Sequence, residues 1–242
     1  MITVGIDLAA QPERTAACRI EWNAGAARVT DLDGRNVDDA RILELVEGAN
    51  RSGLDVPLGW PEAFVVAVGA HHAAQRWPGG TPAQLRLRAT DRWVAERTGR
   101  WPLSVSTDRI AMPAFRTALV LSRASFPVDR AGGGRVVEVY PAAALLRWGF
   151  DSRRYKRVAG AEARASLVRT FVAPTRQWLT LDDAMINKCI ASDDAFDALV
   201  AALVARAAAI GLTEPIPADS RELAAREGWI ALPVDGSLDR LA

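Results

Sequence analysis

Three apolar runs near the N-terminus have the composition of β-strands. Residues 2–8 are rich in β-branched side chains and predict a buried strand, and residues 14–22 and 28–32 predict two more. The sequence Asn23-Ala24-Gly25 separates the last two runs and is typical of a hairpin turn. Strands joined by consecutive hairpins are antiparallel, so we expect the chain to open with a three-stranded antiparallel unit.

A change of periodicity follows this unit. Apolar residues recur at helical spacing over 38–49, and residues 54–56 then predict a short strand that ends at Pro57. A helix between two strands favours their parallel pairing, which would place the fourth strand beside the first in a mixed sheet. The first and fourth strands would then end at the same edge, where open α/β sheets bind ligands.

The rest of the chain is mostly helical in pattern. Residues 61–125 predict helices interrupted at 77–82 and 99–102, which we interpret as a helical insertion into a single domain spanning residues 1–242. A Val-rich strand is predicted at 135–140, helices at 141–148, 161–171, 182–190 and 193–210, and an edge strand at 228–233. The expected fold class is α/β, with three antiparallel strands, then parallel strands, and helices on both faces.

Composition narrows the range of partners. The 242 residues include 30 Lys and Arg against 29 Asp and Glu, a net charge of +1, which excludes attachment to nucleic acid or membrane by bulk charge. A nucleic acid would have to be bound by a local patch. The longest apolar stretch, residues 195–211, is interrupted by Asp197 and Arg206 and is shorter than the ~20 residues that span a bilayer, so we expect no membrane partner.

The cysteines and the N-terminus indicate a cytoplasmic location. Cys18 and Cys189 are too few for a disulfide framework or a zinc site, and a reducing compartment fits them. The opening residues lack a basic region and reach Asp7 too early for a signal peptide.

Three carboxylates interrupt apolar strands near their C-terminal ends. These are Asp7, Asp55 and Glu138. Acidic residues are depleted in strands, and an unpaired buried carboxylate costs several kcal/mol. Each of them taken singly could instead be a structural acid that pairs with an arginine. Together they favour a shared site for a hard divalent cation, because carboxylate oxygens are the preferred ligands of such ions.

A second acidic group opens the helix predicted at 193–210. Asp194 and Asp197 are three residues apart and therefore lie on one helix face. Helix capping explains Asp193 or Asp194, because free backbone amides at a helix start bind side-chain oxygens. Capping does not explain Asp197, which lies within an apolar run.

Two basic segments are weaker candidates for contact with a substrate. Arg88 and Asp91 have the spacing of neighbours on a helix face. A second cluster comprises Arg153, Arg154, Lys156 and Arg157. Trp148 and Tyr155 are interleaved with this cluster, and aromatic side chains among cations suit single-stranded nucleic acid, although a solvated surface explains the same pattern.

Five short stretches resemble a known family. They begin with Gly5-Ile6-Asp7-Leu8-Ala9 and Asp55-Val56-Pro57-Leu58-Gly59-Trp60-Pro61 and continue with Arg88-Ala89-Thr90-Asp91, Glu138-Val139-Tyr140-Pro141-Ala142-Ala143 and Asp194-Ala195-Phe196-Asp197-Ala198-Leu199. In this order and spacing the chain resembles the domain of unknown function 429 family, whose members are predicted nucleases of the RNase H-like fold. The helical stretch also resembles the late-helix acids of Holliday-junction resolvases.

The resemblance implies a metal-dependent nuclease. Asp7, Asp55, Asp194 and Asp197 match metal-ligand positions, with Glu138 as an additional candidate. Two Mg²⁺ or Mn²⁺ ions would support hydrolysis of phosphodiester bonds, with Asp7 bridging them, Asp55 and Asp194 each holding one, and Asp197 completing a ligand shell or orienting water. The alternatives are a non-catalytic binding module and, less favoured, an ATP-dependent phosphotransferase, because Leu8-Ala9-Ala10 offers few groups that wrap phosphate.

Overall fold

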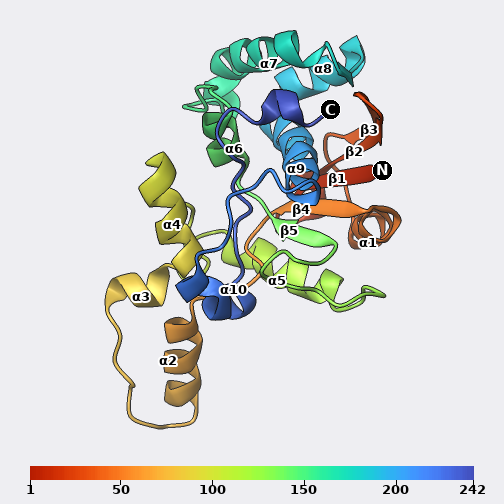
Figure 1. Cartoon of the computed structure of the whole chain (residues 1–242). Coiled ribbons are helices and arrows are strands. Elements are labelled where there is room, and N and C mark those ends of the chain that lie inside the picture. The colour runs from red at the N-terminus through yellow and green to blue at the C-terminus, as the bar shows by residue number, and fades with distance from the viewer.

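A mixed sheet of six strands runs through the computed structural model, which describes residues 1–242 (Figure 1). The spatial order is β5-β4-β1-β2-β3-β6. The strands are β1 (Ile2–Asp7), β2 (Ala16–Asn23), β3 (Ala26–Asp33), β4 (Arg51–Asp55), β5 (Val136–Glu138) and β6 (Leu179–Thr180). The pairs β1–β2 and β2–β3 are antiparallel, whereas β1–β4, β4–β5 and β3–β6 are parallel. This topology confirms the predicted α/β class and is consistent with an RNase H-like fold.

Helices cover both faces of the sheet, as predicted. They are α1 (Asp39–Gly48), α2 (Glu62–His72), α3 (Pro82–Arg86), α4 (Ala89–Thr98), α5 (Ala111–Leu121), α6 (Pro141–Arg147), α7 (Ala161–Thr175), α8 (Asp183–Ala191), α9 (Asp193–Ala209) and α10 (Arg221–Glu227). The larger core of 35 buried residues joins one face to α6, α7, α8 and α9. A second core of 17 residues lies on the other face, beneath α1 and α5.

Alternation along each strand determines which side chains enter which core. Val4 and Ile6 of β1 and Leu54 of β4 belong to the core under α1 and α5. Successive side chains of a strand point to opposite faces, so Gly5, Asp7, Gly53 and Asp55 face α9 instead.

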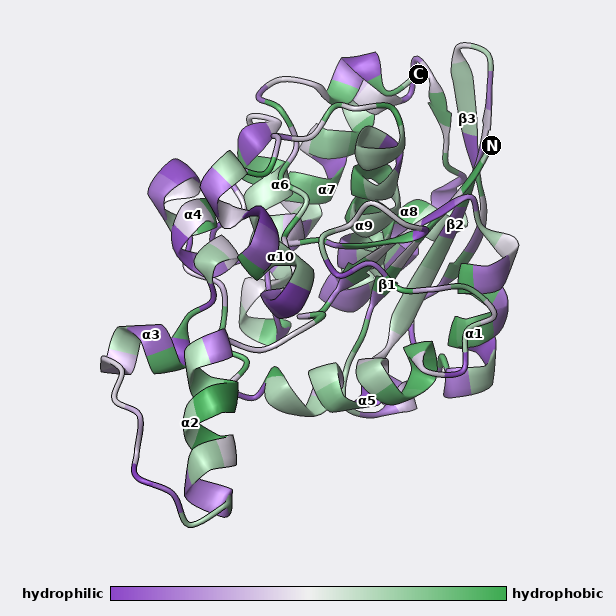
Figure 2. Ribbon diagram, turned by 60° about the horizontal axis from the view of Figure 1, so that its bottom comes forward, coloured by the Kyte–Doolittle hydropathy of each residue, from purple (hydrophilic) through white to green (hydrophobic).

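The segment between β4 and β5 carries four helices, α2 to α5. Figures 1 and 2 show α2 and α3 projecting from the rest of the molecule, whereas α5 lies against the sheet. Only Ala67 of α2 is buried, and Val65, Val66 and Val68 are exposed. Helix α4 contacts α10, and between them the rings of Trp93 and Trp229 lie 5.2 Å apart.

Two features of the C-terminal half differ from the sequence expectations. Residues 228–233 form isolated bridges, Glu138 with Ile230 and Thr213 with Pro233, rather than an edge strand. Gly228, with φ +86°, bends the backbone, and the amide of Ile230 donates to Thr90 Oγ1 instead of to a strand. Strand β6 was not predicted because its two residues are too few to show a period. No helix combines the length and apolar character needed to cross a membrane.

Candidate metal centre

The register of β1 and β4 places two aspartates side by side. In this parallel pair Asp7 lies opposite Asp55, and both residues end their strands. Both face α9, so their carboxylates emerge together at the C-terminal edge of the sheet. The predicted juxtaposition of these two acids therefore follows from one strand pairing.

A pair of glycines lets α9 approach close enough to add a third carboxylate. Gly5 lies opposite Gly53 in the same register, and a Cβ at Gly5 would lie 2.1 Å from the carbonyl oxygen of Ala198. A Cβ at Gly53 would lie 2.4 Å from the carbonyl oxygen of Ala201. Only glycine permits this contact between helix backbone and sheet, which brings Asp197 of α9 beside the strand ends.

Asp7, Asp55 and Asp197 form what we call the carboxylate cluster. One oxygen from each lies within 4.8 Å of the others. Asp197 is fully buried, whereas Asp7 and Asp55 are partly buried. Asp197 accepts a hydrogen bond of 2.6 Å from the phenol of Tyr155 and forms an ion pair with the ammonium of Lys156. The carboxylates of Asp7 and Asp55 accept no hydrogen bond and join no ion pair within the chain.

Burial raises the pKa of all three acids. The pKa of Asp55 is raised to about 7, first by burial and then by the neighbouring carboxylates, with Lys156 opposing the shift. The pKa values of Asp7 and Asp197 are raised for the same first reason. Burial alone would lower the pKa of Lys156, but Asp197 and its neighbours raise it well above its usual range, so the ammonium stays charged.

The composition of the cluster fits a hard divalent cation. Three carboxylates and one ammonium leave an excess of negative charge when all are ionised, and Asp7 and Asp55 have free oxygen lone pairs. Oxygen ligands from carboxylates suit Mg²⁺ or Mn²⁺. Asp7, Asp55 and Asp197 are the residues that would hold the ion.

A loop held by Arg164 places Tyr155 and Lys156 beside the cluster. The buried guanidinium of Arg164 donates to the carbonyl oxygens of Tyr155, Arg157, Ile190 and Ala191, which joins the loop to the junction of α8 and α9. Arg157 has φ +65° and ψ −178°, a conformation that costs a non-glycine residue about 1–3 kcal/mol. Strain of this kind persists only where the surroundings enforce it, and this loop conformation places the ammonium of Lys156 in an ion pair with Asp197.

A family model described as "Protein of unknown function (DUF429)" matches residues 5–222, which include every residue of the cluster. The chain belongs to the DUF429 family. No curated protein and no solved structure matches it. The description of the DUF429 family names no activity, so the family match does not specify the chemistry of the carboxylate cluster.

Asp194 of this DUF429 protein lies outside the cluster. It pairs with the exposed Arg14 at 3.4 Å, one turn before Asp197 on α9. The cap of α9 is Ser192, whose hydroxyl accepts from the amide of Ala195, so neither Asp193 nor Asp194 is the cap. Both lie in the first turn, where acids complement the helix dipole. Asp193 instead accepts from the backbone amide of Arg157.

Glu138 of the DUF429 protein faces the other way. It lies opposite Leu54, not Asp55, and therefore points to the opposite face of the sheet from the cluster. Arg88 donates to both of its oxygens at 2.6 and 2.7 Å, and the amide of Leu58 donates at 2.9 Å. Glu138 is therefore paired with an arginine, as a structural acid would be, and the structure does not bring it to Asp7.

Arg88 and Asp91 belong to this same buried group. The guanidinium of Arg88 is 1% exposed and donates to Asp91 at 2.8 and 3.2 Å as well as to Glu138 and to the carbonyl oxygen of Glu227. All five guanidinium N–H donors are thus used within the protein. We call Arg88, Asp91 and Glu138 the arginine network. The spacing of Arg88 and Asp91 predicted that they are neighbours, and they do form an ion pair, but the pair is buried and not on a solvated helix face.

The basic segment at 153–157 of the DUF429 protein does not form one continuous surface patch, because Tyr155 and Lys156 contact Asp197. Arg153 and Arg154 are exposed, and Arg153 pairs with Asp151 at 2.7 Å. Trp148 and Tyr155 are buried, so the interpretation that they stack on nucleic acid is wrong. The sequence showed Tyr155 and Lys156 only as members of a basic run, and their contact with Asp197 across 41 or more residues left no local signal.

Proposed function

We propose that this protein is a metal-dependent hydrolase of phosphodiester bonds in nucleic acid and that it holds Mg²⁺ or Mn²⁺ in the carboxylate cluster. The observation that carries the proposal is the convergence of Asp7 and Asp55, which have no internal partners, on the buried Asp197. A structural role would be expected to leave each acid paired, as it leaves Glu138.

In this proposal some residues bind the metal ion and others position its ligands. Tyr155 and Lys156 fix the orientation of Asp197, and Asp7 and Asp55 offer their free oxygens to the ion. Asp7, Asp55 and Asp197 would hold the divalent ion, which when bound would lower the pKa of a water ligand and stabilise the leaving oxygen, so that no side-chain general base would be needed. A second ion would have to recruit Asp194, which pairs with Arg14.

The non-catalytic alternative is favoured by a different observation. Glu138 is bound by Arg88, and Asp197 is bound by Lys156, as expected of a module whose acids serve only its own structure. That pattern leaves Asp7 and Asp55 unexplained, because partly buried carboxylates without partners weaken the fold.

Calorimetric titration of Mn²⁺ tests the metal site. We expect heat of binding for the wild type, none for Asp7→Asn, and wild-type heat for the control Asp151→Asn, which removes an exposed carboxylate paired only with Arg153. Circular dichroism establishes that each variant is folded. A folded wild type that takes up neither Mn²⁺ nor Mg²⁺ would sink the proposal.

Cleavage of end-labelled DNA and RNA tests the reaction. We expect hydrolysis that requires Mg²⁺ or Mn²⁺, stops with EDTA and is lost in Asp7→Asn. Full activity in that variant would refute the role given to Asp7, and the absence of any cleavage with a metal-loaded wild type would favour the binding module.

A further inference from the structure

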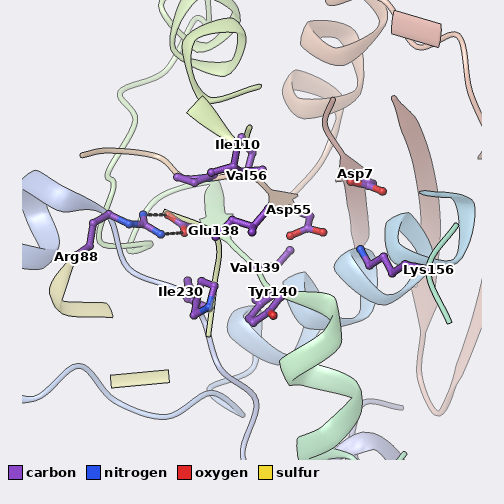
Figure 3. Close-up of a pocket in the computed structure, with 13 residues that line it drawn as sticks. Asp7, Asp55, Val56, Arg88, Ile110, Glu138, Val139, Tyr140, Lys156 and Ile230 are labelled. Carbon is purple, nitrogen blue, oxygen red and sulfur yellow. Dashed lines mark hydrogen bonds and ion pairs between the residues drawn. The ribbon is translucent and has the colours of Figure 1, made fainter. Parts of the chain in front are cut away.

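A small cavity lies beside the carboxylate cluster. Its volume is about 180 Å³, and Asp7, Asp55 and Lys156 form part of its lining. In Figure 3 its lining residues run from Asp7 and Lys156, past Asp55, to Glu138 and Arg88 of the arginine network. Part of a substrate bound in the cavity would therefore lie next to a phosphodiester bond held at the carboxylate cluster.

The walls of this cavity are mostly apolar. They come from separate parts of the chain and comprise Val56, Pro57, Pro102, Leu103, Ile110, Val139, Tyr140 and Ile230. Cavities for drug-sized ligands span ~300–1,000 Å³, so this one accepts a single small ring system and excludes a base pair. Apolar walls with one aromatic side chain are the surroundings in which proteins hold a nucleobase removed from its stack.

The far end of the cavity offers hydrogen-bond acceptors. Arg88 lines it, but all of its donors are used within the arginine network. Oε2 of Glu138 accepts from Arg88 and Leu58, whereas Oε1 accepts only from Arg88 and keeps a lone pair free. An acceptor at this end suits the ring or amino N–H groups of a base and disfavours an anion.

A wider groove opens on the other side of the cluster. It has a volume of about 630 Å³ and shares Asp7, Leu103, Ile110 and Lys156 with the cavity. The exposed side chains of Arg14, Arg109 and Arg157 line it, together with the carboxylates of Asp193 and Asp194. Arg14 pairs with Asp194, whereas neither Arg109 nor Arg157 has a carboxylate partner. Unpaired arginines along an open groove suit the phosphates of a nucleic-acid backbone.

We propose that the cavity binds one unpaired nucleobase while the groove holds the backbone of the same strand. This proposal rests on the proposed function and gives its substrate class: single-stranded nucleic acid, or a duplex in which one nucleotide has left its pair. A fully paired duplex would have to break a base pair before it could place a base in the cavity, which costs a few kcal/mol. The apolar walls, the acceptor end and the basic groove act together on one nucleotide at the cluster.

Fluorescence anisotropy with labelled DNA tests this substrate class. The probes are one sequence as a single strand, as a perfect duplex and as a duplex with one bulged nucleotide, measured with the wild type in EDTA so that metal-dependent cleavage cannot occur. We expect the single strand and the bulged duplex to bind on the order of tenfold more tightly than the perfect duplex. Equal affinity for all three overturns the proposal.

A variant of the cavity wall separates the base site from the groove. Tyr140→Ala removes the aromatic wall and should abolish the preference for unpaired bases, whereas Tyr140→Phe should keep it. A preference unchanged in Tyr140→Ala would overturn the assignment of the cavity. Deoxynucleoside monophosphate is the competitor: competition as strong as that of the oligonucleotide would identify a free nucleotide as the ligand and overturn the role of the groove.

The binding and cleavage experiments distinguish a failure of the proposed base site from a failure of the proposed hydrolysis. Preference for unpaired bases without metal-dependent cleavage would leave the base site standing and remove the proposed hydrolysis. Cleavage of a perfect duplex as fast as of a single strand would leave the hydrolysis standing and remove the base site.

Discussion

Two groups of buried acids lie on opposite faces of one sheet, and their surroundings differ. In the arginine network Glu138 and Asp91 share a guanidinium whose five donors are all used. In the carboxylate cluster only Asp197 has partners, and Asp7 and Asp55 have none. In the first group every charge has a partner, so removal of one partner should be strongly destabilising. In the second group Asp7 and Asp55 keep the free oxygens that the proposed cation would need, and without a cation their unpaired charges cost stability.

Removal of the guanidinium is expected to have the largest effect on stability. Arg88→Ala leaves two buried carboxylates without a counter-charge and should lower the free energy of unfolding by about 3–5 kcal/mol. Urea denaturation measures the change. A loss below about 1 kcal/mol would mean that the network does not differ from the cluster in the way described.

The glycine pair links stability to the cluster. Gly53→Ala forces a Cβ into the backbone of α9 and should cost about 1–3 kcal/mol together with the heat of Mn²⁺ binding. Gly48→Ala is the matched control, because a Cβ there meets no atom within 4 Å. Undiminished Mn²⁺ binding in Gly53→Ala would show that the close approach of α9 is not needed for the site.

Matched amide substitutions test whether the unpaired and the paired acids differ in their effect on stability. In EDTA at pH 8, Asp55→Asn should be more stable than the wild type by more than about 1 kcal/mol, because it removes an unpaired charge, whereas Asp91→Asn should be less stable. Saturating Mn²⁺ should stabilise the wild type and not Asp55→Asn. Thermal unfolding with and without Mn²⁺ measures both effects.

The pH dependence of stability reports on the same carboxylate. The pKa of Asp55 is raised from 3.8 in the unfolded chain to about 7, so the folded protein binds the extra proton. Its contribution to stability is fully present below pH 3.8 and is lost as the pH rises through about 7. In EDTA the advantage of Asp55→Asn over the wild type should therefore grow between pH 5 and pH 8, and a constant difference would contradict the raised pKa.

The smallest expected effect concerns the groove. Arg157→Ala should weaken binding of a single-stranded oligonucleotide only a few-fold and reduce the salt dependence of binding by the equivalent of about one phosphate contact. Arg153→Ala is the control, because Arg153 pairs with Asp151 outside the groove. Equal losses in both variants would indicate general attraction by surface charge.

Most strands and helices could be predicted from local sequence patterns. Which acids reach the carboxylate cluster depends on the pairing register of β1, β4 and β5, which those patterns do not specify. The acids at Asp7 and Asp55 were predicted to meet because parallel strands end at a common edge, and the pairing of β1 with β4 brings them together. Glu138 carries the same local signal, an acid in a Val-rich strand. A shift of one position in strand pairing reverses the face of a side chain, and no local pattern specifies that shift.

The helix acids show a second limit of sequence reasoning. Asp194 and Asp197 share a helix face, but the close contact of α9 with Gly5 and Gly53 determines which of the two reaches the strand ends. Tyr155 and Lys156 approach Asp197 through a loop whose shape depends on Arg164. Contacts of this range become visible only when the whole chain is folded.

The contact of α9 with two facing glycines also has an evolutionary consequence. Gly5 and Gly53 contact backbone atoms of α9, not side chains. A larger residue at either position therefore cannot be accommodated by shortening a neighbouring side chain. A saturation library selected for activity should therefore show Gly5 and Gly53 to be as intolerant as the aspartates, although neither glycine carries a functional group.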